Sequence, residues 1–442
     1  MQSVFRIATM LGAFAVPAYA EPVTEFALDN GLKIVVIEDH RAPVVTQMVW
    51  FKTGRADEPA GQSGIAHFFE HLMFKGTDIV ASGEFSAIVA ANGGSDNAFT
   101  SDDYTAYYQR VPADQLGEMM RLEADRMANL NLSTENVATE LQVILEERGQ
   151  RVDSDPSALF REQMTAAQYL NHPYALPVIG WLHEMQELNR DKALEFYARH
   201  YAPNNAILVV AGDVDPAAVR DLAQTHYGPL APSKTLPARL RPSEPPQLAA
   251  RRLAMSDARV AQPYIMRTYL APERNAGDQK QAAAITILAE VLGGSGTTSI
   301  LSRALQFESK IAVYSGAGYS GVSVDATTFS LIVVPSAGVP LAVAEKALDE
   351  TLAKFMETGV DPADLARIKT QVRAAEIYAR DDAGDLANTY GAALAVGLGV
   401  QDVQNWPTAL DAVTEDDVMS AARAVLIPEH SVTGWLETKA TP

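Results

Sequence analysis

The sequence contains no cysteine in any of its 442 positions. Disulfides, thiolate metal ligands and thiol nucleophiles are therefore excluded, and so is a lipid anchor attached to an N-terminal cysteine. A chain without crosslinks must be stabilised by its apolar core alone. At this length the chain can bury a large core, and we expect at least two domains.

Positive charge is also scarce. The chain has 35 Lys and Arg residues against 55 Asp and Glu residues, which gives a net charge of −20 at pH 7. Binding to the phosphates of nucleic acid requires a basic surface, so we expect no nucleic acid partner. Basic or neutral peptides are compatible with this charge, although solubility alone also explains it.

Long apolar runs are missing after the N-terminus, where no stretch reaches the ~18 uncharged apolar residues of a transmembrane helix. The N-terminus itself has the pattern of a secretory signal: Arg6, a mostly apolar run over Ile7–Val16, and the cleavage motif Ala18-Tyr19-Ala20. We predict cleavage after Ala20 and a periplasmic or secreted protein with no membrane span after cleavage. A membrane anchor is the alternative, but the run is too short to span a bilayer.

Histidine is rare, with 8 residues in the chain, yet two of them lie four positions apart in His67-Phe68-Phe69-Glu70-His71. Positions i and i+4 of a helix share one face, where two neutral imidazoles suit a Zn2+ ion. Glu70 lies beside that face, where a carboxylate can act as a general base. A chance coincidence is the alternative. However, the neighbours are apolar on nearly all sides, which predicts a buried helix, capped by Ser63 and ended by Gly76, whose polar groups need partners.

Strand and helix patterns alternate along the first half of the chain. Asn30-Gly31 between two apolar runs is a strong hairpin signal and predicts two paired strands within Phe26–Ile37. We also predict strands over Val44–Lys52 and Ala98–Arg110, and helices over Asp114–Leu130 and Ser133–Val152.

Six prolines fall between Pro229 and Pro246 in a stretch without periodic apolar residues, which predicts an interdomain linker over residues 229–248. One long ordered loop is the alternative. The segments on either side follow a similar plan, because each closes on a strand, over Ala206–Ala211 in the first half and Ser431–Leu436 in the second. We therefore predict a signal peptide at residues 1–20, a metal-bearing catalytic domain at 21–228 and a homologous metal-free domain at 249–442.

The predicted fold class is α+β, with two homologous α/β-sandwich domains in tandem. Each is expected to be a mostly antiparallel sheet with helices packed on one face. In the second half, a helix is predicted over Ala282–Leu292, in the place that corresponds to the His67 helix, but it carries no histidine. Only the first half can therefore hold the metal in this way.

A catalytic zinc site needs a third protein ligand and one open position. The predicted helix over Ser133–Val152 offers Glu140, Glu146 and Glu147. Glu140 and Glu147 share a face over two turns, whereas Glu146 points about 100° away. Any one of these residues is also compatible with a solvated helix face, so spacing alone leaves the third ligand open.

The H-x-x-E-H motif, a distal Glu and two similar halves resemble the insulinase/pitrilysin family of zinc peptidases, the inverzincins. The resemblance covers residues 21–440 and is greatest to short bacterial members similar to processing peptidases. In that family the third ligand lies in a V-I-x-x-E context, which matches Val143-Ile144-Leu145-Glu146-Glu147 and selects Glu147. The family also has a supporting acidic residue seven positions earlier, and Glu140 matches it.

The resemblance implies one Zn2+ per chain on His67, His71 and Glu147, with Glu70 as the base. The implied activity is that of a zinc-dependent endopeptidase acting on peptides or unfolded polypeptides in the periplasm. A non-catalytic or peptide-binding subunit of a two-chain peptidase assembly is the alternative. Glu70 argues against it, because a structural zinc site needs no base and is usually closed by four ligands.

The family also binds substrate as an added strand along a sheet edge. The segment Gly94–Thr100 resembles that edge, which implies substrate contacts at Asn97, Ala98 and Phe99. A plain turn leading into a strand is the alternative.

Many family members place an Arg and a Tyr, seven positions apart, from the second domain onto the substrate. Tyr314 matches the Tyr, but the position of the Arg is occupied by Phe307. The resemblance therefore implies a dimer, in which a metal-free homologous subunit can complete the site. A core or rim tyrosine is an equally good interpretation of Tyr314.

Overall fold

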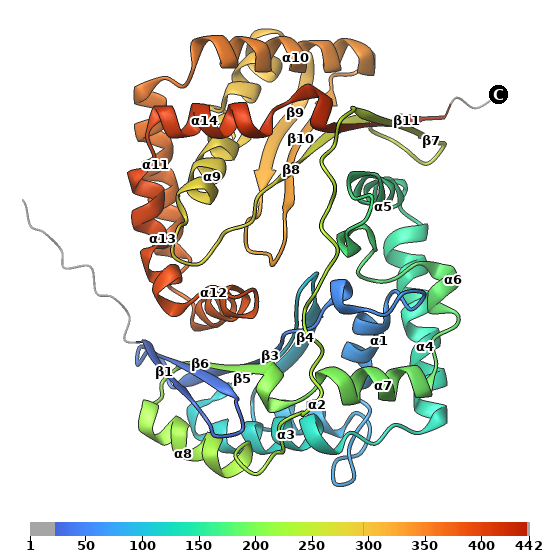
Figure 1. Cartoon of the computed structure of the whole chain (residues 1–442), viewed down its shortest axis with the longest axis vertical. Coiled ribbons are helices and arrows are strands. Elements are labelled where there is room, and N and C mark those ends of the chain that lie inside the picture. Colours follow the sequence, from blue (N-terminus) through green and yellow to red (C-terminus); the bar gives the residue numbers. More distant parts are fainter. Residues whose placement is uncertain (1–22, 295, 440–442) are drawn as a thin grey trace, which may run out of the picture.

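The computed structural model describes residues 23–294 and 296–439, and these form two sheets covered by helices (Figure 1). The predicted signal peptide and its cleavage site at Ala20 lie outside these residues. The strands are β1 (Val23–Ala27), β2 (Lys33–Glu38), β3 (Val44–Phe51), β4 (Ser95–Thr100), β5 (Thr105–Pro112), β6 (Ala206–Gly212), β7 (Arg251–Asp257), β8 (Tyr264–Ala271), β9 (Ala312–Tyr319), β10 (Thr327–Pro335) and β11 (Ser431–Thr438).

The helices divide between the two halves of the chain. The first half has α1 (Ile65–Leu72), α2 (Glu84–Ala91), α3 (Leu116–Asn129), α4 (Thr134–Arg148), α5 (Pro156–Gln168), α6 (Leu182–Met185), α7 (Arg190–His200) and α8 (Pro216–His226). The second half has α9 (Lys280–Gly293), α10 (Leu341–Thr358), α11 (Pro362–Tyr378), α12 (Ala383–Ala395), α13 (Val400–Ala412) and α14 (Glu415–Val425). Within residues 23–294 and 296–439, no helix combines the length and the apolar character needed to cross a membrane.

The first hairpin forms where it was predicted. Strands β1 and β2 pair antiparallel, from Val23 opposite Ile37 to Ala27 opposite Lys33. Gly31 has a φ of 88° in the turn, a conformation that costs glycine little. The Asn30 side chain donates a hydrogen bond of 2.7 Å to a backbone carbonyl at the C-terminal end of α8. The turn therefore reverses the chain and also ties it to a distant helix.

The prediction of one strand over Ala98–Arg110 was wrong. This region is divided between β4 and β5, which pair antiparallel from Ser95 opposite Arg110 to Thr100 opposite Thr105. The turn between them is closed by a 2.8 Å hydrogen bond from the Ser101 N–H to the Tyr104 carbonyl. Ser and Asp in this turn favour chain reversal, but the aromatic residues that follow hide that signal in the sequence.

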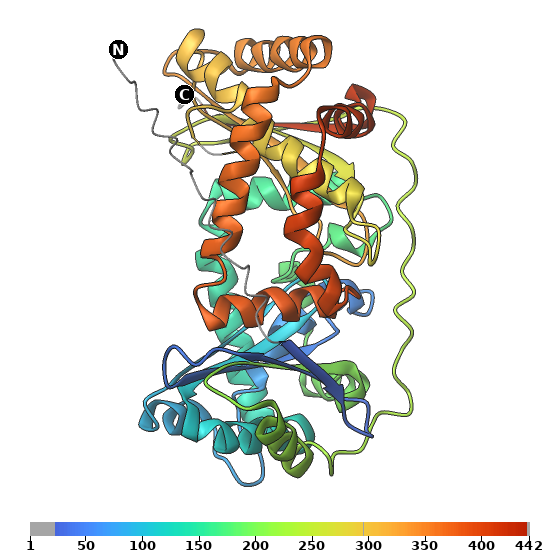
Figure 2. The same ribbon diagram turned by 90° about the vertical axis from the view of Figure 1, so that its left-hand side faces the viewer.

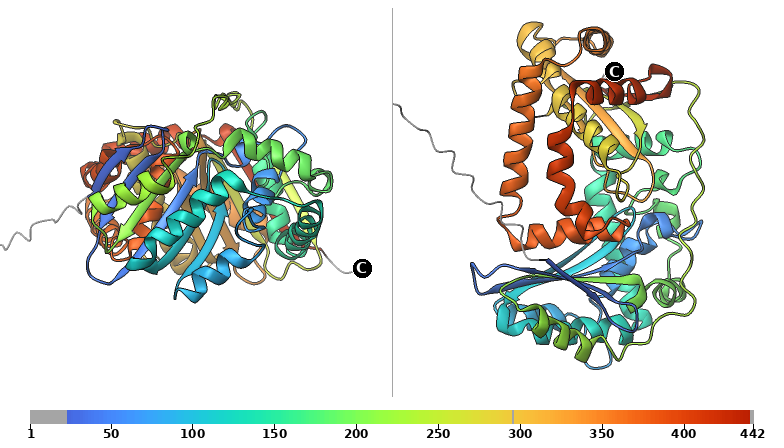
Figure 3. Two further views of the ribbon diagram at one scale, coloured as in Figure 1. Left: turned by 90° about the horizontal axis from the view of Figure 1, so that it is seen from below. Right: turned by 60° about the vertical axis from the view of Figure 1, so that its left-hand side comes forward.

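The two sheets share one topology, which confirms the prediction of two tandem domains of the same type. The order β2-β6-β3-β5-β4 of the first sheet corresponds to β7-β11-β8-β10-β9 of the second. In each sheet the strand that closes the half pairs parallel with one neighbour, β6 with β2 and β11 with β7. The other pairs are antiparallel, and β1 is an addition to the first sheet. The first half's own helices cover one face of its sheet (Figure 3).

The opposite face of each sheet receives a helix from the other half, which the sequence did not predict. Helix α12 lies across β3 and β6, above the first sheet in Figures 1 and 2. There Leu386 and Tyr390 of α12 pack around the fully buried Trp50. In the reverse direction, Phe160 and Met164 of α5 pack on Val432 and Leu436 of the second sheet. Each sheet is thus buried on both faces only because the two halves exchange a helix.

The proline-rich stretch at residues 229–248 contains no helix or strand and runs along the outside of both halves (Figure 2). Arg241 in this stretch is buried and pairs with Asp57 at 3.0 Å, Asp103 at 2.5 Å and Asp325 at 3.0 Å. Asp57 and Asp103 belong to the first half, and Asp325 belongs to the turn between β9 and β10. We place the boundary between the two domains in this stretch as a proposal, and its arginine links both halves.

We predict that Gly391→Ala destabilises the packing of α12 on the first sheet. An added Cβ would lie 2.0 Å from the Trp50 indole, and such overpacking costs about 1–3 kcal/mol or more. Denaturant unfolding measures the change. Gly149→Ala is the matched control, because a Cβ there meets no atom within 4 Å. Equal stability of the two variants would contradict the packing described for α12.

Candidate functional site

Helix α1 carries the His67-Phe68-Phe69-Glu70-His71 motif, and its N-terminus is capped from an unexpected place. The prediction that Ser63 is the cap was wrong. The N-cap is Gly64, whose φ of 87° suits glycine, and its missing side chain is replaced by Glu58. The Glu58 carboxylate accepts hydrogen bonds of 3.0 Å from the backbone N–H groups of Gly64 and Ala66. Ser63 instead accepts a hydrogen bond from the Trp181 N–H.

The end of α1 also differs from the prediction. The helix ends at Leu72, and Gly76 lies beyond it, in the turn that follows. The shorter helix still presents both histidines, because His67 lies in its first turn and His71 in its last. The predicted burial is confirmed, since Ile65, Phe68 and Phe69 are fully buried.

A close backbone contact fixes α1 relative to α4. Gly64 and Gly180 both have positive φ, and a Cβ on either would lie within 2.5 Å of a carbonyl oxygen of the other segment. Arg148, the last residue of α4, donates a 2.7 Å hydrogen bond to the Gly180 carbonyl. The loop at Gly180 therefore connects the start of the histidine helix to the end of the helix that carries Glu147.

The structure brings His67, His71 and Glu147 together. Oε2 of Glu147 lies 3.7 Å from Nε2 of His67 and 3.3 Å from Nε2 of His71. One donor atom from each residue falls in a group whose members lie within 4.8 Å of one another. Ligand atoms about 2.1 Å from a tetrahedral zinc ion lie roughly 3.4 Å apart, which is close to the two distances from Glu147. By contrast, Glu146 is exposed and accepts a hydrogen bond from Gln150.

Both histidines have surroundings that suit ligands. Burial lowers the pKa of His67 to about 3, so its ring is neutral at neutral pH, the form that binds metal. Burial opposes the charged form of His71 as well, but its hydrogen bond with Glu140 and the other carboxylates around it raise the pKa overall. A metal on Nε2 would compete with that proton.

Glu140 is placed to orient His71, as the resemblance implied. Its Oε1 lies 2.8 Å from Nδ1 of His71, and its Oε2 pairs with the Lys75 ammonium. Burial opposes the charge of Glu140, but the hydrogen bonds from His71 and Lys75 lower its pKa overall. A carboxylate in this position fixes the ring and the tautomer of a ligating histidine.

Glu70 lies next to the three donor residues without being part of their group. Its Oε2 accepts a 2.6 Å hydrogen bond from the Thr100 hydroxyl at the end of β4. Burial raises the pKa of Glu70, although the Thr100 hydrogen bond opposes the rise. A carboxylate with a raised pKa is a stronger base for water than an exposed one.

A cavity of about 790 Å³ is lined by His67, Glu70, His71 and Glu147. Asn97, Ala98 and Phe99 of β4 line it, and β4 is an edge strand that pairs only with β5 among the described strands. The other walls of the cavity were not predicted. Their residues are Arg55, Arg151, Val152, Ala158, Arg161, Glu162, Thr165, Ala175, Pro177, Val178 and Ile179. Among these residues, only Arg151 could have been found from the sequence, because it follows Glu147 by four positions. Its guanidinium pairs with the Glu147 carboxylate at 2.6 Å.

Phe307 and Tyr314 do not line this cavity. Both side chains are exposed, Phe307 in the π-helical turn Ser302–Glu308 and Tyr314 on β9. The structure of the single chain therefore supplies no contact from these two residues to the metal-ligand group.

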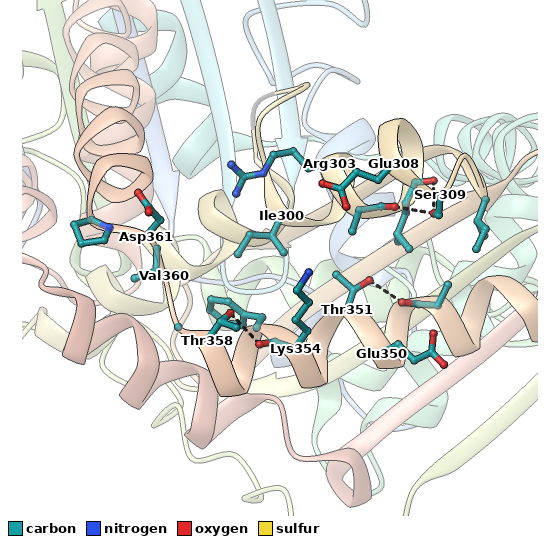
Figure 4. Close-up of a pocket in the computed structure, with 17 residues that line it drawn as sticks. Ile300, Arg303, Glu308, Ser309, Glu350, Thr351, Lys354, Thr358, Val360 and Asp361 are labelled. Atoms are coloured by element: carbon teal, nitrogen blue, oxygen red, sulfur yellow. Dashed lines mark hydrogen bonds between the residues drawn. The ribbon is translucent and has the colours of Figure 1, made fainter.

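A second cavity of about 730 Å³ lies in the second half, between Ser302–Glu308 and α10 (Figure 4). Its hydroxyl groups are turned back onto their own helix, since Thr351 donates to the Ala347 carbonyl and Thr358 to the Lys354 carbonyl. Arg303 pairs with Asp364 at 2.6 Å. No metal-ligand group of the described residues lies here, so the cavity at α1 is the candidate site.

Comparison with protein families and known proteins shows the family of the chain. Residues 33–180 match the family described as Insulinase (Peptidase family M16), and residues 187–372 match Peptidase M16 inactive domain. The chain is 28% identical to Zinc protease PqqE of Helicobacter pylori over 87% of this chain and 86% of that protein.

Solved structures share the fold. The crystal structure of a protease from Helicobacter pylori has a TM-score of 0.88 and 27% identity, over 94% of this chain and all of that chain. The periplasmic protease PqqL from Escherichia coli has a TM-score of 0.80 and 19% identity, over 94% of this chain but 48% of that chain. At that identity, the second likeness shows the fold alone.

We predict that Glu140→Gln weakens zinc binding about 10–100-fold, because the neutral amide no longer holds the His71 ring as strongly. Competition with a chromophoric chelator measures the affinity. Glu146→Gln is the matched control, since it removes a carboxylate from the exposed side of the same helix. If both variants bind zinc equally well, Glu140 does not support the ligand.

Proposed function

Because the chain belongs to the insulinase family of peptidases, we propose that it is a zinc-dependent endopeptidase that hydrolyses peptides or unfolded polypeptides in the periplasm. The observation that carries the proposal is the convergence of three metal-donor atoms with a separate carboxylate in one cavity. Relatives named zinc proteases support a protease function for the chain.

His67, His71 and Glu147 would hold the ion, with one Zn2+ per chain. Two neutral imidazoles and a carboxylate form a donor set that suits zinc and leaves one position open. When bound, zinc lowers the pKa of water toward roughly 7 and polarises a carbonyl group. The interaction of Glu140 with His71 keeps Nδ1 of that ring engaged and leaves Nε2 for the metal.

Glu70 would act as the general base. Its carboxylate takes the proton of the attacking water and later gives it to the leaving amine. The Thr100 hydroxyl holds one carboxylate oxygen and leaves the other for that proton transfer. Because Thr100 ends β4, the same strand that would bind the substrate also positions the base.

The unpaired edge of β4 would bind the substrate as an added strand through Asn97, Ala98 and Phe99. Main-chain pairing is independent of side-chain identity, so it suits unfolded polypeptides of varied sequence. The Ala98 N–H donates a 2.9 Å hydrogen bond to the Asn97 side chain, an interaction that an added strand would replace.

The proposed location rests on the signal pattern at residues 1–20 and on the description of PqqL as periplasmic. The proposed partner is a second subunit, either another copy or a metal-free homologue. Phe307 at the Arg position and the exposure of Tyr314 support a site completed from outside the chain. In PqqL a single polypeptide of about twice this length includes a first half that matches this chain.

A non-catalytic or peptide-binding subunit is the second candidate. The exposed Phe307 favours it, because a subunit lacking part of its substrate contacts can serve an assembly without turnover of its own. The partly buried, hydrogen-bonded Glu70 opposes it, since a purely structural metal site has no use for a base.

We predict that Glu70→Gln retains zinc but loses hydrolysis of an unstructured peptide by at least about 10²-fold, because the amide cannot accept the proton. Zinc content is measured by metal analysis and cleavage by mass spectrometry. Chelation should stop the wild-type reaction and zinc should restore it, while Glu146→Gln keeps full activity. Retained cleavage by zinc-loaded Glu70→Gln would sink the assignment of the base.

We predict that the protein purified from its natural source has a native mass of at least two chains, because the single chain does not bring Tyr314 to the cavity. Native mass measurement distinguishes a homodimer from a complex with a homologue. A monomer with full peptidase activity would refute the need for a partner.

A further inference from the structure

We propose that Arg161, assisted by Arg151, forms an anion-binding subsite that selects peptides with an acidic side chain within a few residues of the scissile bond. This inference rests on the proposed function and adds the substrate class. An extended chain advances about 3.3 Å per residue. A cavity of about 790 Å³ therefore holds only a short segment, and a cation on its wall meets side chains close to the reacting bond.

Helix α5 supplies the wall that carries Arg161. Ala158, Arg161, Glu162 and Thr165 line the cavity and follow the i, i+3, i+4, i+7 spacing of one helix face. The other face is seated on the second sheet through Phe160 and Met164, which are nearly fully buried. The arginine therefore projects from a rigid backbone, and the small neighbours Ala158 and Thr165 leave room beside it.

Most other charges of the cavity wall are already compensated. Glu162 pairs with the buried Arg148 at 2.8 Å, so it adds no net negative charge next to Arg161. Arg55 pairs with Asp102 at 2.6 Å and donates a hydrogen bond to the Leu176 carbonyl. These two contacts occupy its guanidinium, so it is not free to bind a substrate. These pairs leave the two remaining arginines as the cations that a substrate can meet.

Arg161 is the less engaged of the two. Its nearest carboxylate is that of Asp155 at 3.9 Å, and 54% of its side chain is exposed. It also lies beside the Tyr264 hydroxyl, a neutral group that leaves the charge uncompensated. A guanidinium has five N–H donors and matches a carboxylate in a two-pronged pair, so Arg161 has unused capacity for an acidic side chain.

Arg151 adds positive charge at the metal end of the same cavity. One of its nitrogens pairs with Glu147, yet 74% of the side chain is exposed. If zinc occupies the neighbouring donor atoms, the carboxylate of Glu147 is shared and the local charge becomes more positive. The wall carries three arginines and three glutamates, so it has no net negative charge in a chain whose net charge is −20, and bound zinc would make it positive. Such a cavity favours acidic side chains over basic ones.

The test uses peptides that differ at one position only, as Asp, Asn or Lys, scanned over the residues on both sides of the scissile bond. For the wild type we expect kcat/KM to be at least about tenfold higher for Asp than for Asn at one of these positions. Arg161→Glu should abolish that preference and favour Lys instead. Arg110→Glu is the matched control, because Arg110 is 55% exposed, lies 4.0 Å from its nearest carboxylate and does not line the cavity.

A binding assay separates this inference from the proposed function. Zinc-loaded Glu70→Gln protein, with and without Arg161→Glu, is titrated with the same labelled peptides by fluorescence anisotropy. If the wild type cleaves none of the peptides but Arg161 still sets the Asp preference in binding, the proposed activity fails and the subsite stands. If peptides are cleaved or bound with the same Asp-to-Asn ratio before and after Arg161→Glu, the subsite is refuted.

Discussion

The position of α5 between the two halves is the constraint on which the rest of the molecule depends. One face of this helix is buried in the second sheet, and the other is a wall of the candidate site. Glu162 of α5 pairs with the buried Arg148, which follows the proposed ligand Glu147 directly. The apolar packing of the second half thus reaches the metal-donor group through one helix and one ion pair. The second half contributes none of the three donor residues, yet its packing helps to position them.

Buried charge serves two separate tasks in this fold. Arg241 and its three carboxylates link the proline-rich stretch at residues 229–248 to both halves. Removal of one partner from such a group leaves an uncompensated buried charge, which costs about 3–5 kcal/mol of stability. At the site itself, burial changes the protonation of His67 and Glu70. It keeps His67 neutral and makes Glu70 a stronger base, while the carboxylate of Glu140 engages the remaining nitrogen of His71.

The two halves share a frame but differ at the helix that follows the third strand of the shared order. The two sheets share their strand order, and α9 follows β8 as α1 follows β3. Yet α9 consists mainly of alanine, isoleucine and leucine, whose burial builds a core, and it has no histidine in place of His67 and His71. The two halves therefore share a frame, and the proposed metal donors and base are found in the first half alone among the described residues.

The sequence by itself determined the features that depend on local geometry. The spacing of His67 and His71 fixes two imidazoles on one helix face, and the Asn30-Gly31 turn fixes the first hairpin, because neither needs information from distant residues. The spacing of Glu140 and Glu147 placed these two candidates for the third ligand on one helix face. Only the family resemblance selected Glu147. The structure then placed that carboxylate 3.3 Å from His71.

Only the tertiary structure decided the features that join distant segments. Glu58 caps α1 in place of Ser63, and the Thr100 hydroxyl holds the Glu70 carboxylate. Helix α5 packs on the second sheet and brings Arg161 to the cavity of the first half. The exchange of α5 and α12 between the halves could not be predicted from the sequence. An apolar helix face has the same residue pattern whether it packs on its own sheet or on the other one. The apolar periodicity of a helix predicts that one face is buried. The packing of the whole chain determines which sheet covers that face.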